Sequence, residues 1–137
     1  MRNLILMTAI TFTAMVSAQK VNLEVSMTGF ENNDGKVHVG LYKSEETFLK
    51  KGYKRIVSKI NSKTATATFE NLEPGEYAVS VYQDENSNGK MDSNFVGIPK
   101  EAYGTSNGAK GFMGPPKYKD AKFVLTADKR IAIKLND

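Results

Sequence analysis

The chain has 137 residues, no cysteine and a formal net charge of +4, and its lysines are scattered along the sequence. This length suits one domain with a single hydrophobic core, and the absence of cysteine excludes a disulfide framework. The scattered basic residues do not form the dense stripe of a nucleic-acid-binding face. We therefore expect a single-domain protein with no nucleic acid among its partners.

The first eighteen residues have the three parts of a secretory signal peptide. A short positive segment, Met1–Asn3, is followed by an apolar run over residues 4–16, and Val16-Ser17-Ala18 provides small residues before a cleavage point. A membrane-spanning helix would need about 20 apolar residues, more than this run offers. The sequence predicts a signal peptide over residues 1–18, a periplasmic or secreted domain over residues 19–137, and no membrane span after cleavage.

Apolar and polar residues alternate with a period of two along much of residues 19–137, which predicts antiparallel strands. The predicted strands are, in chain order, residues 21–27, 37–42, 53–60, 63–69, 77–82, 121–126 and 130–135. The turn sequence over residues 32–35, Asn-Asn-Asp-Gly, predicts a hairpin between the first two. The fifth should bury Tyr77, Val79 and Val81. About seven short strands predict an all-β protein, an antiparallel two-layer β-sandwich with Greek-key connections, with a small barrel as the alternative.

Two segments interrupt this pattern. Residues 44–51 predict one short helix or turn, because Ser44 can cap the first amides of a helix although a full capping box is missing. Residues 84–120 show no strand pattern and hold six of the eleven glycines and three of the four prolines. Because a loop of this length inside a compact domain is commonly functional or disordered, we predict one long ordered loop that carries the site.

The start of this loop has the spacing of a calcium site. Oxygen-bearing side chains at Asp84, Asn86 and Asn88 occupy alternate positions before Gly89, as calcium loops require. The carbonyl of Lys90 and the carboxylate of Asp92 follow. Phe95 stands where helix-loop-helix sites place a glutamate, so Glu101 is predicted to close the shell. The alternative is an Asn/Gly-rich turn held by side-chain to backbone hydrogen bonds.

Several of these motifs together resemble a family of exported bacterial proteins catalogued only as a domain of unknown function. They are D-x-N-x-N-G-x-x-D from Asp84, G-I-P-K-E-A-Y-G from Gly97, G-P-P from Gly114, and A-K-F from Ala121. The resemblance implies no particular activity. More loosely, residues 71–79 are similar to the turn and strand of prealbumin-like sandwich domains, such as those attached to carboxypeptidases, which supports the fold alone.

Little in the sequence indicates catalysis. His38 is the only histidine, and a lone histidine within a strand is usually a surface residue or a cross-strand partner. No nucleophile elbow, zinc-ligand pair or phosphate-binding glycine loop is present. The sequence therefore favours a non-catalytic binding or structural domain. A small carbohydrate-active hydrolase that uses loop carboxylates is the alternative.

Four aromatic residues of the long loop are candidates for a ligand surface, because aromatic faces offer apolar contact with polar edges. They are Phe95, Tyr103, Phe112 and Tyr118. The ligand would be an envelope or extracellular glycan or protein. The alternative interpretation is that these rings hold the loop against an open face of the sandwich.

Overall fold

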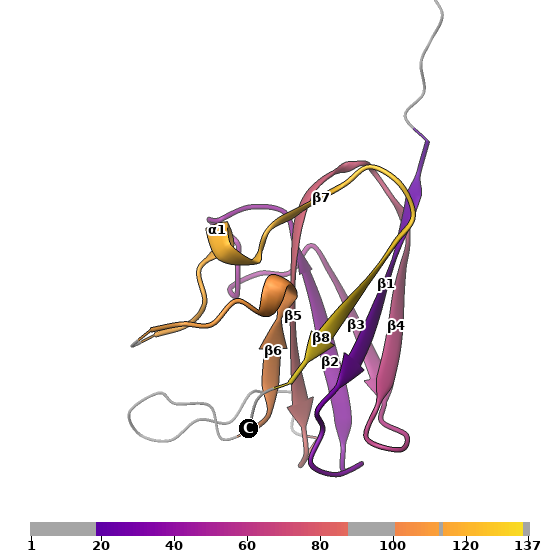
Figure 1. Cartoon of the computed structure of the whole chain (residues 1–137), viewed down its shortest axis with the longest axis vertical. Coiled ribbons are helices and arrows are strands. Elements are labelled where there is room, and N and C mark those ends of the chain that lie inside the picture. Colours follow the sequence, from indigo (N-terminus) through magenta and orange to yellow (C-terminus); the bar gives the residue numbers. More distant parts are fainter. Residues whose placement is uncertain (1–18, 88–100, 113, 136–137) are drawn as a thin grey trace, which may run out of the picture.

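Strands make up about half of the part of the chain that the computed structural model describes, which is residues 19–87, 101–112 and 114–135 (Figure 1). A 3-10 helix, η1, and a single-turn α-helix, α1, are the helical elements there. In chain order the elements are β1 (Val21–Thr28), β2 (Lys36–Tyr42), β3 (Lys54–Lys59), β4 (Ala65–Leu72), β5 (Gly75–Asp84), β6 (Tyr103–Thr105), η1 (Ser106–Gly108), α1 (Tyr118–Ala121), β7 (Phe123–Leu125) and β8 (Lys129–Lys134).

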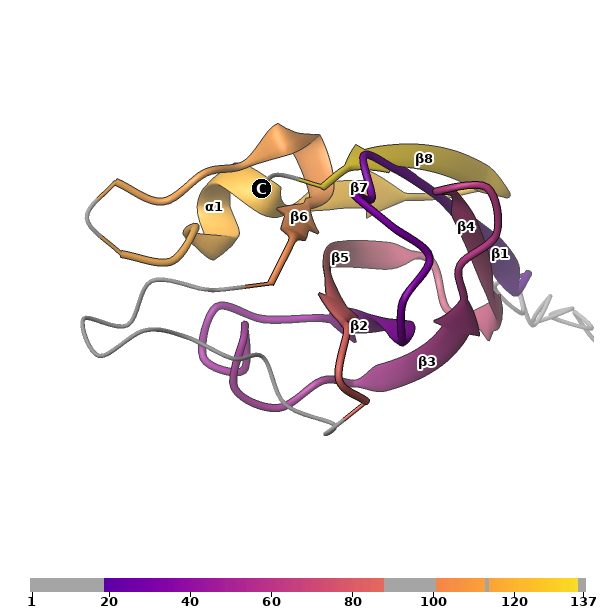
Figure 2. The same cartoon turned by 90° about the horizontal axis from the view of Figure 1, so that it is seen from below.

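The strands divide into two sheets that face each other (Figure 2). The first sheet has the order β4-β1-β8, and the second has the order β3-β2-β5-β6, with β7 also paired to β5. The predicted all-β sandwich is therefore confirmed. No helix within these described residues is long and apolar enough to cross a bilayer.

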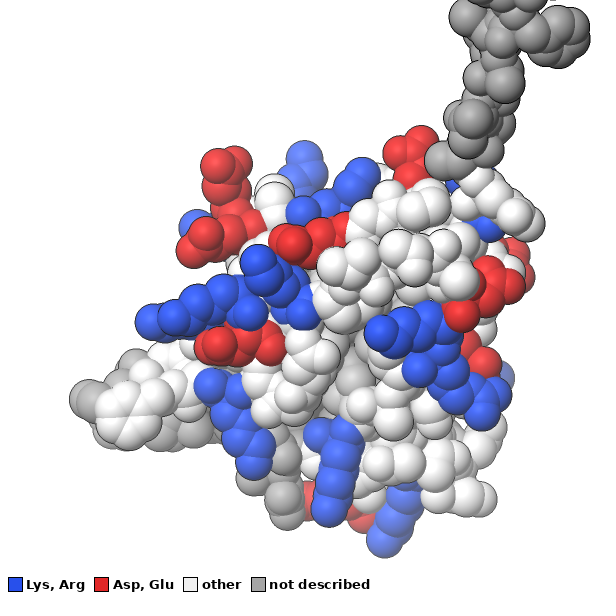
Figure 3. Space-filling view, turned by 45° about the horizontal axis from the view of Figure 1, so that its top comes forward, with Lys and Arg blue, Asp and Glu red and all other residues white. Residues whose placement is uncertain are grey.

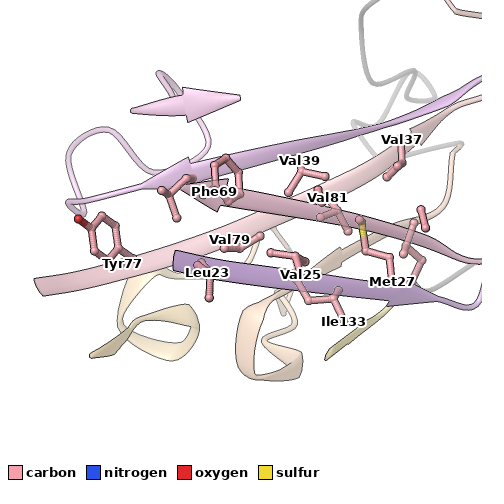
Figure 4. Packing of buried hydrophobic residues seen from close by; sticks show 14 of the residues in the cluster. Leu23, Val25, Met27, Val37, Val39, Phe69, Tyr77, Val79, Val81 and Ile133 are labelled. Atoms are coloured by element: carbon pink, nitrogen blue, oxygen red, sulfur yellow. The ribbon is translucent and has the colours of Figure 1, made fainter. Parts of the chain in front are cut away.

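The core lies between the two sheets, because each strand turns its alternate apolar residues inward (Figure 4). The prediction for β5 is confirmed, since Tyr77, Val79 and Val81 are all buried. Tyr77 also donates its hydroxyl hydrogen bond to the carbonyl oxygen of Glu73 at 2.5 Å, which fixes the turn before the strand.

The predicted hairpin between the first two strands is wrong. β1 pairs with β4 and β8, whereas β2 pairs with β3 and β5, so the two strands belong to different sheets. The connection crosses from one sheet to the other and buries Phe30 on the way. The side-chain amide of buried Gln83 donates hydrogen bonds to Oδ1 of Asn32 at 2.8 Å and to the backbone carbonyl of Asp34 at 3.0 Å.

One strand pair is parallel rather than antiparallel. β8 runs alongside β1 in the same direction, from Leu23 opposite Lys129 to Thr28 opposite Lys134. β7, which precedes it, pairs with β5 in the other sheet, so the chain crosses the sandwich between the two. The crossing is fixed where the carboxylate of Asp128 accepts a hydrogen bond from the amide of Asn22 at 2.8 Å.

The segment predicted as one long loop is more structured than expected. Residues 88–100 lie outside the described part, but the rest contains β6, η1 and α1. Buried Ser106 explains this order, because its hydroxyl accepts from the amide of Val79 at 3.0 Å and donates to the carbonyl of Ala121 at 2.6 Å. Each element has only three or four residues, too few to produce a periodic pattern.

A second, smaller cluster covers part of the outer face of β5. Residues 44–51 form turns, as one of the two predicted alternatives, and the amide of Phe48 donates to the carbonyl of Ser44 at 3.1 Å. Phe48 then packs against Tyr118, with ring centroids 5.7 Å apart, over Ala78 and Ala121. Because Ala121 ends α1, the strand predicted over residues 121–126 begins only at Phe123.

Candidate functional site

The outer face of the second sheet carries a group of polar and aromatic side chains at one end. Alternation along β2 and β5 turns His38 and Tyr82 outward, and the register places them directly opposite each other. Their rings stack with centroids 4.8 Å apart and an interplanar angle of 7°. His38 is thus a cross-strand partner, as expected for a lone histidine within a strand.

Both ring nitrogens of His38 are engaged. The Nη2 atom of Arg55 lies 2.5 Å from Nδ1 of His38 and also donates a hydrogen bond to the Tyr82 hydroxyl at 2.8 Å. A guanidinium group can only donate, so Nδ1 accepts and Nε2 carries the hydrogen. Nε2 lies 3.2 Å from Oδ2 of Asp84, to which it therefore donates.

This arrangement favours neutral imidazole. Burial of the ring lowers the pKa of His38, and the neighbouring Arg55 guanidinium lowers it further, against the opposing effect of Asp84. The hydrogen bonds and the charges therefore agree, and the neutral ring serves as a fixed donor to the Asp84 carboxylate.

Asp84 and Glu101 meet where the chain leaves β5 and later returns. Both carboxylates are buried, with 1% and 7% of the residue exposed. Two hydrogen bonds join the departing and returning segments. The backbone amide of Gln83 donates to the carbonyl oxygen of Ala102, and the backbone amide of Glu85 donates to Oε2 of Glu101 at 2.7 Å. The charges of Asp84 and Glu101 both act on His38. The predicted first ligand and the predicted closing carboxylate of the calcium site thus lie at the same end of β5.

The remaining predicted metal ligands are only partly described. Asn86 is exposed, just beyond the end of β5. Asn88, Lys90 and Asp92 lie outside the described residues. Within residues 19–87, 101–112 and 114–135, no three His, Asp or Glu side chains are grouped so that they could hold a metal ion.

A hollow of about 190 Å³ lies beside this network and is lined by Lys36, His38, Val57, Asp84 and Ser87. It brings a serine, a histidine and an aspartate to one place. A serine nucleophile needs a histidine nitrogen that can accept its proton. Here Nδ1 already accepts from Arg55 and Nε2 carries a hydrogen, so the arrangement does not activate Ser87.

A larger hollow of about 370 Å³ lies on the first sheet and includes Asn22, Asp128 and Lys129 in its lining. Its lining also includes an ion pair, since the Arg130 guanidinium donates two hydrogen bonds of 3.0 Å to the carboxylate of Glu24. These charged groups satisfy each other, and the hollow offers less for a ligand than the end of β5.

The predicted aromatic ligand surface is only partly exposed. Phe112 is 92% exposed and Tyr103 is half-buried opposite Tyr82. Tyr118 is buried under Phe48, so its assignment to a ligand surface is wrong, and it holds its segment against the sheet as the alternative interpretation required. Phe95 lies outside the described residues.

Sequence reasoning did not find the partners of His38. Arg55 lies on β3, whereas Tyr82 and Asp84 lie on β5, and only the strand register brings them to His38 on β2. The sequence does indicate that His38 and Tyr82 face solvent, because both occupy positions between the inward-facing apolar residues of their strands. The alternation within each strand does not show that these two residues lie opposite each other.

Fold and site together define a two-sheet β-sandwich domain with two buried carboxylates, Asp84 and Glu101, at the end of β5 and His38 hydrogen-bonded to the first of them. The chain belongs to DUF2141, a family of uncharacterized proteins conserved in bacteria, which it matches over residues 25–134. The resemblance to a domain of unknown function is thereby confirmed. No curated protein and no solved structure gives a significant match.

Proposed function

We propose that the protein is an exported, non-catalytic binding or structural domain whose segment after β5 is stabilised by calcium. The observation that carries this proposal is the burial of Asp84 and Glu101 at one end of β5. Calcium takes about six to eight hard oxygen ligands, and these two carboxylates would bring two of them together from different parts of the chain. The sequence adds oxygen-bearing side chains at alternate positions between these two residues, which calcium sites require.

The ion would be held by hard oxygen donors. Asp84 and Asn86 would provide the first side-chain ligands, and Asn88, the carbonyl of Lys90 and Asp92 would follow as the sequence spacing predicts. Glu101 would close the shell from the returning segment. His38 would act from outside the shell, because its Nε2 hydrogen bond orients the Asp84 carboxylate.

The alternative, a carbohydrate-active hydrolase, needs two carboxyl groups that face each other across a substrate cleft, about 5–10 Å apart. Asp84 and Glu101 are buried, and each is engaged by a hydrogen-bond donor of the protein, His38 or the amide of Glu85. This arrangement supports binding better than hydrolysis.

Calcium dependence of the melting temperature tests the proposal. An ion that binds only the folded protein at about tenfold above its Kd adds about 1.4 kcal/mol, or a rise in Tm of about 5 °C. Asp92→Asn and Glu101→Gln should each reduce this rise. Asp34→Asn, which removes a carboxylate from the turn before β2, is the matched control and should leave it unchanged. Equal melting temperatures in calcium and in chelator would refute the proposal.

A further inference from the structure

The segment between η1 and α1 extends from the body of the sandwich (Figure 1). Both of its ends are anchored. The Ser106 hydroxyl donates to the carbonyl of Ala121 at 2.6 Å, and the Asn107 side chain donates to the carbonyl of Lys122 at 2.8 Å. Tyr118 is buried against Phe48 at the returning end. The protruding segment therefore has a rigid base.

Phe112 lies on this protruding segment and is 92% exposed, the highest value among the large apolar side chains of the described residues. The next, Val124 on β7, is 63% exposed. A phenylalanine that is open on nearly all sides gains nothing from the fold of its own chain, because apolar surface left in water contributes no stabilisation. Its exposure is therefore explained better by a contact outside the chain.

The charges around this tip are mainly positive. Lys110 and Lys117 are exposed in the segment and Lys119 is exposed on α1, and residues 109–119 contain no acidic residue. Two acidic residues lie near its returning end: Asp120 on α1, and Glu76 on β5, whose carboxylate lies 3.7 Å from the Lys122 ammonium. In Figure 3 the part of the protrusion that is not grey is uncharged, and both blue and red side chains lie on the body beside it. This pattern complements a negative surface.

The shape of the tip distinguishes between partners. A protein partner would need a concave pocket for a ring that projects outward, whereas a lipid surface accepts a convex apolar tip directly. Aromatic side chains with flanking lysines are typical of segments that enter the headgroup region of a bilayer. Each lysine near an anionic surface strengthens the attraction.

We propose that Phe112 inserts into the headgroup region of an anionic phospholipid bilayer, with Lys110, Lys117 and Lys119 contacting the lipid phosphates. The contact is peripheral and reversible, because one aromatic ring and three lysines provide far less apolar area than a membrane-spanning helix. This contact is separate from the end of β5, so it stands or falls independently of calcium.

The chain contains no tryptophan, which provides a direct test. Phe112→Trp introduces a single tryptophan at the tip, and Val124→Trp places one at another exposed position as the matched control. The protein is used in the form the cell produces, with its N-terminus determined by mass spectrometry. Vesicles are made of phosphatidylcholine alone or with phosphatidylglycerol. The Phe112→Trp emission should shift to the blue only with phosphatidylglycerol, and the Val124→Trp emission should not shift.

Vesicle sedimentation then measures the contribution of each group. Phe112→Ser should weaken binding by about tenfold or more, the effect of removing a buried phenylalanine. Lys117→Gln should weaken it by about fivefold at low salt and less at high salt. Val124→Ser should bind as the wild type. Equal binding of Phe112→Ser and wild type, or no preference for phosphatidylglycerol, would overturn the proposal. Self-association that depends on Phe112 without vesicle binding would also overturn it and assign the tip to a second copy of the chain.

Discussion

Gly35 lies directly against the backbone carbonyl of Asp84: a Cβ atom added at Gly35 would stand 1.8 Å from that oxygen. Gly35 also has a φ of 67°, in the left-handed region that glycine adopts most easily. This contact brings the connection before β2 against the end of β5, where the candidate site lies. A side chain at Gly35 would force the two segments apart.

Gly35→Ala should therefore destabilise the protein by about 3 kcal/mol or more, because the strain of a positive φ is added to a backbone clash. Gly108→Ala is the matched control, since Gly108 has a φ of 63° and no atom of the described residues lies within 4 Å of an added Cβ. That variant should cost only about 1–2 kcal/mol. Thermal unfolding measures both, and losses of equal size would contradict the role assigned to the Gly35–Asp84 contact.

The hydrogen bond from His38 to the buried Asp84 carboxylate predicts a second stability difference. His38→Ala removes this donor and should cost about 1.5–3 kcal/mol, the range for hydrogen bonds to charged groups. His38→Gln retains an N–H donor and should recover part of the loss. Val57→Ala, at a 47% exposed position of the same hollow, should cost less than about 0.5 kcal/mol.

Urea unfolding in chelator measures these variants without a contribution from bound ions. The midpoint should shift while the m-value stays the same, which indicates a change in stability alone. If His38→Ala were no more destabilising than Val57→Ala, the His38–Asp84 hydrogen bond would not be a significant support of the site.

The sequence predicted the strands well because burial of one face per strand leaves a visible alternation. Tyr77, Val79 and Val81 are an example, since they are all buried as expected. The same alternation does not say which strand lies next to which. β1 and β2 each bury one face, and they do so equally well from opposite sheets, so the predicted hairpin was wrong.

The candidate site was predictable only where it is local in sequence. The spacing from Asp84 to Asp92 is visible in one short stretch, although most of it lies outside the described residues. Arg55, His38 and Asp84 come together through two strand pairings that the sequence does not specify. β6 is too short to show alternation, so the sequence pattern suggests Glu101 as a ligand but does not fix its position at the end of β5.

Neighbouring Thr105 and Ser106 predict opposite effects of losing a hydroxyl group. Both residues are buried, but the Ser106 hydroxyl bonds Val79 and Ala121, whereas the Thr105 hydroxyl has no hydrogen-bond partner in the part of the chain that the structure describes. Ser106→Ala should cost about 2–3 kcal/mol, because it leaves a buried amide and a buried carbonyl without their partner. Thr105→Val should be neutral or slightly stabilising. Urea midpoints distinguish the two, and a Thr105→Val variant that is as unstable as Ser106→Ala would contradict this assignment.

The buried hydroxyl of Tyr118 predicts a pH dependence at alkaline pH. Burial, and after it the nearby Glu76 carboxylate, raises the pKa of Tyr118 to about 12, while no hydrogen-bond partner of the hydroxyl is found among the described residues. The unfolded chain titrates at about 10. Between these values the unfolded chain loses the proton first, so the contribution of Tyr118 to stability is present below pH 10 and is lost as the pH rises towards 12.

Tyr118→Phe removes this titration and should reduce the fall in unfolding free energy between pH 10 and 12, relative to the wild type. At neutral pH the variant should be as stable as the wild type or more so, because no hydrogen bond is lost. Tyr77→Phe is the matched control at neutral pH: its hydroxyl donates to Glu73, so its loss should cost about 1 kcal/mol. Urea unfolding at a series of pH values measures both effects, and a neutral-pH loss for Tyr118→Phe equal to that of Tyr77→Phe would show that the Tyr118 hydroxyl is bonded in solution.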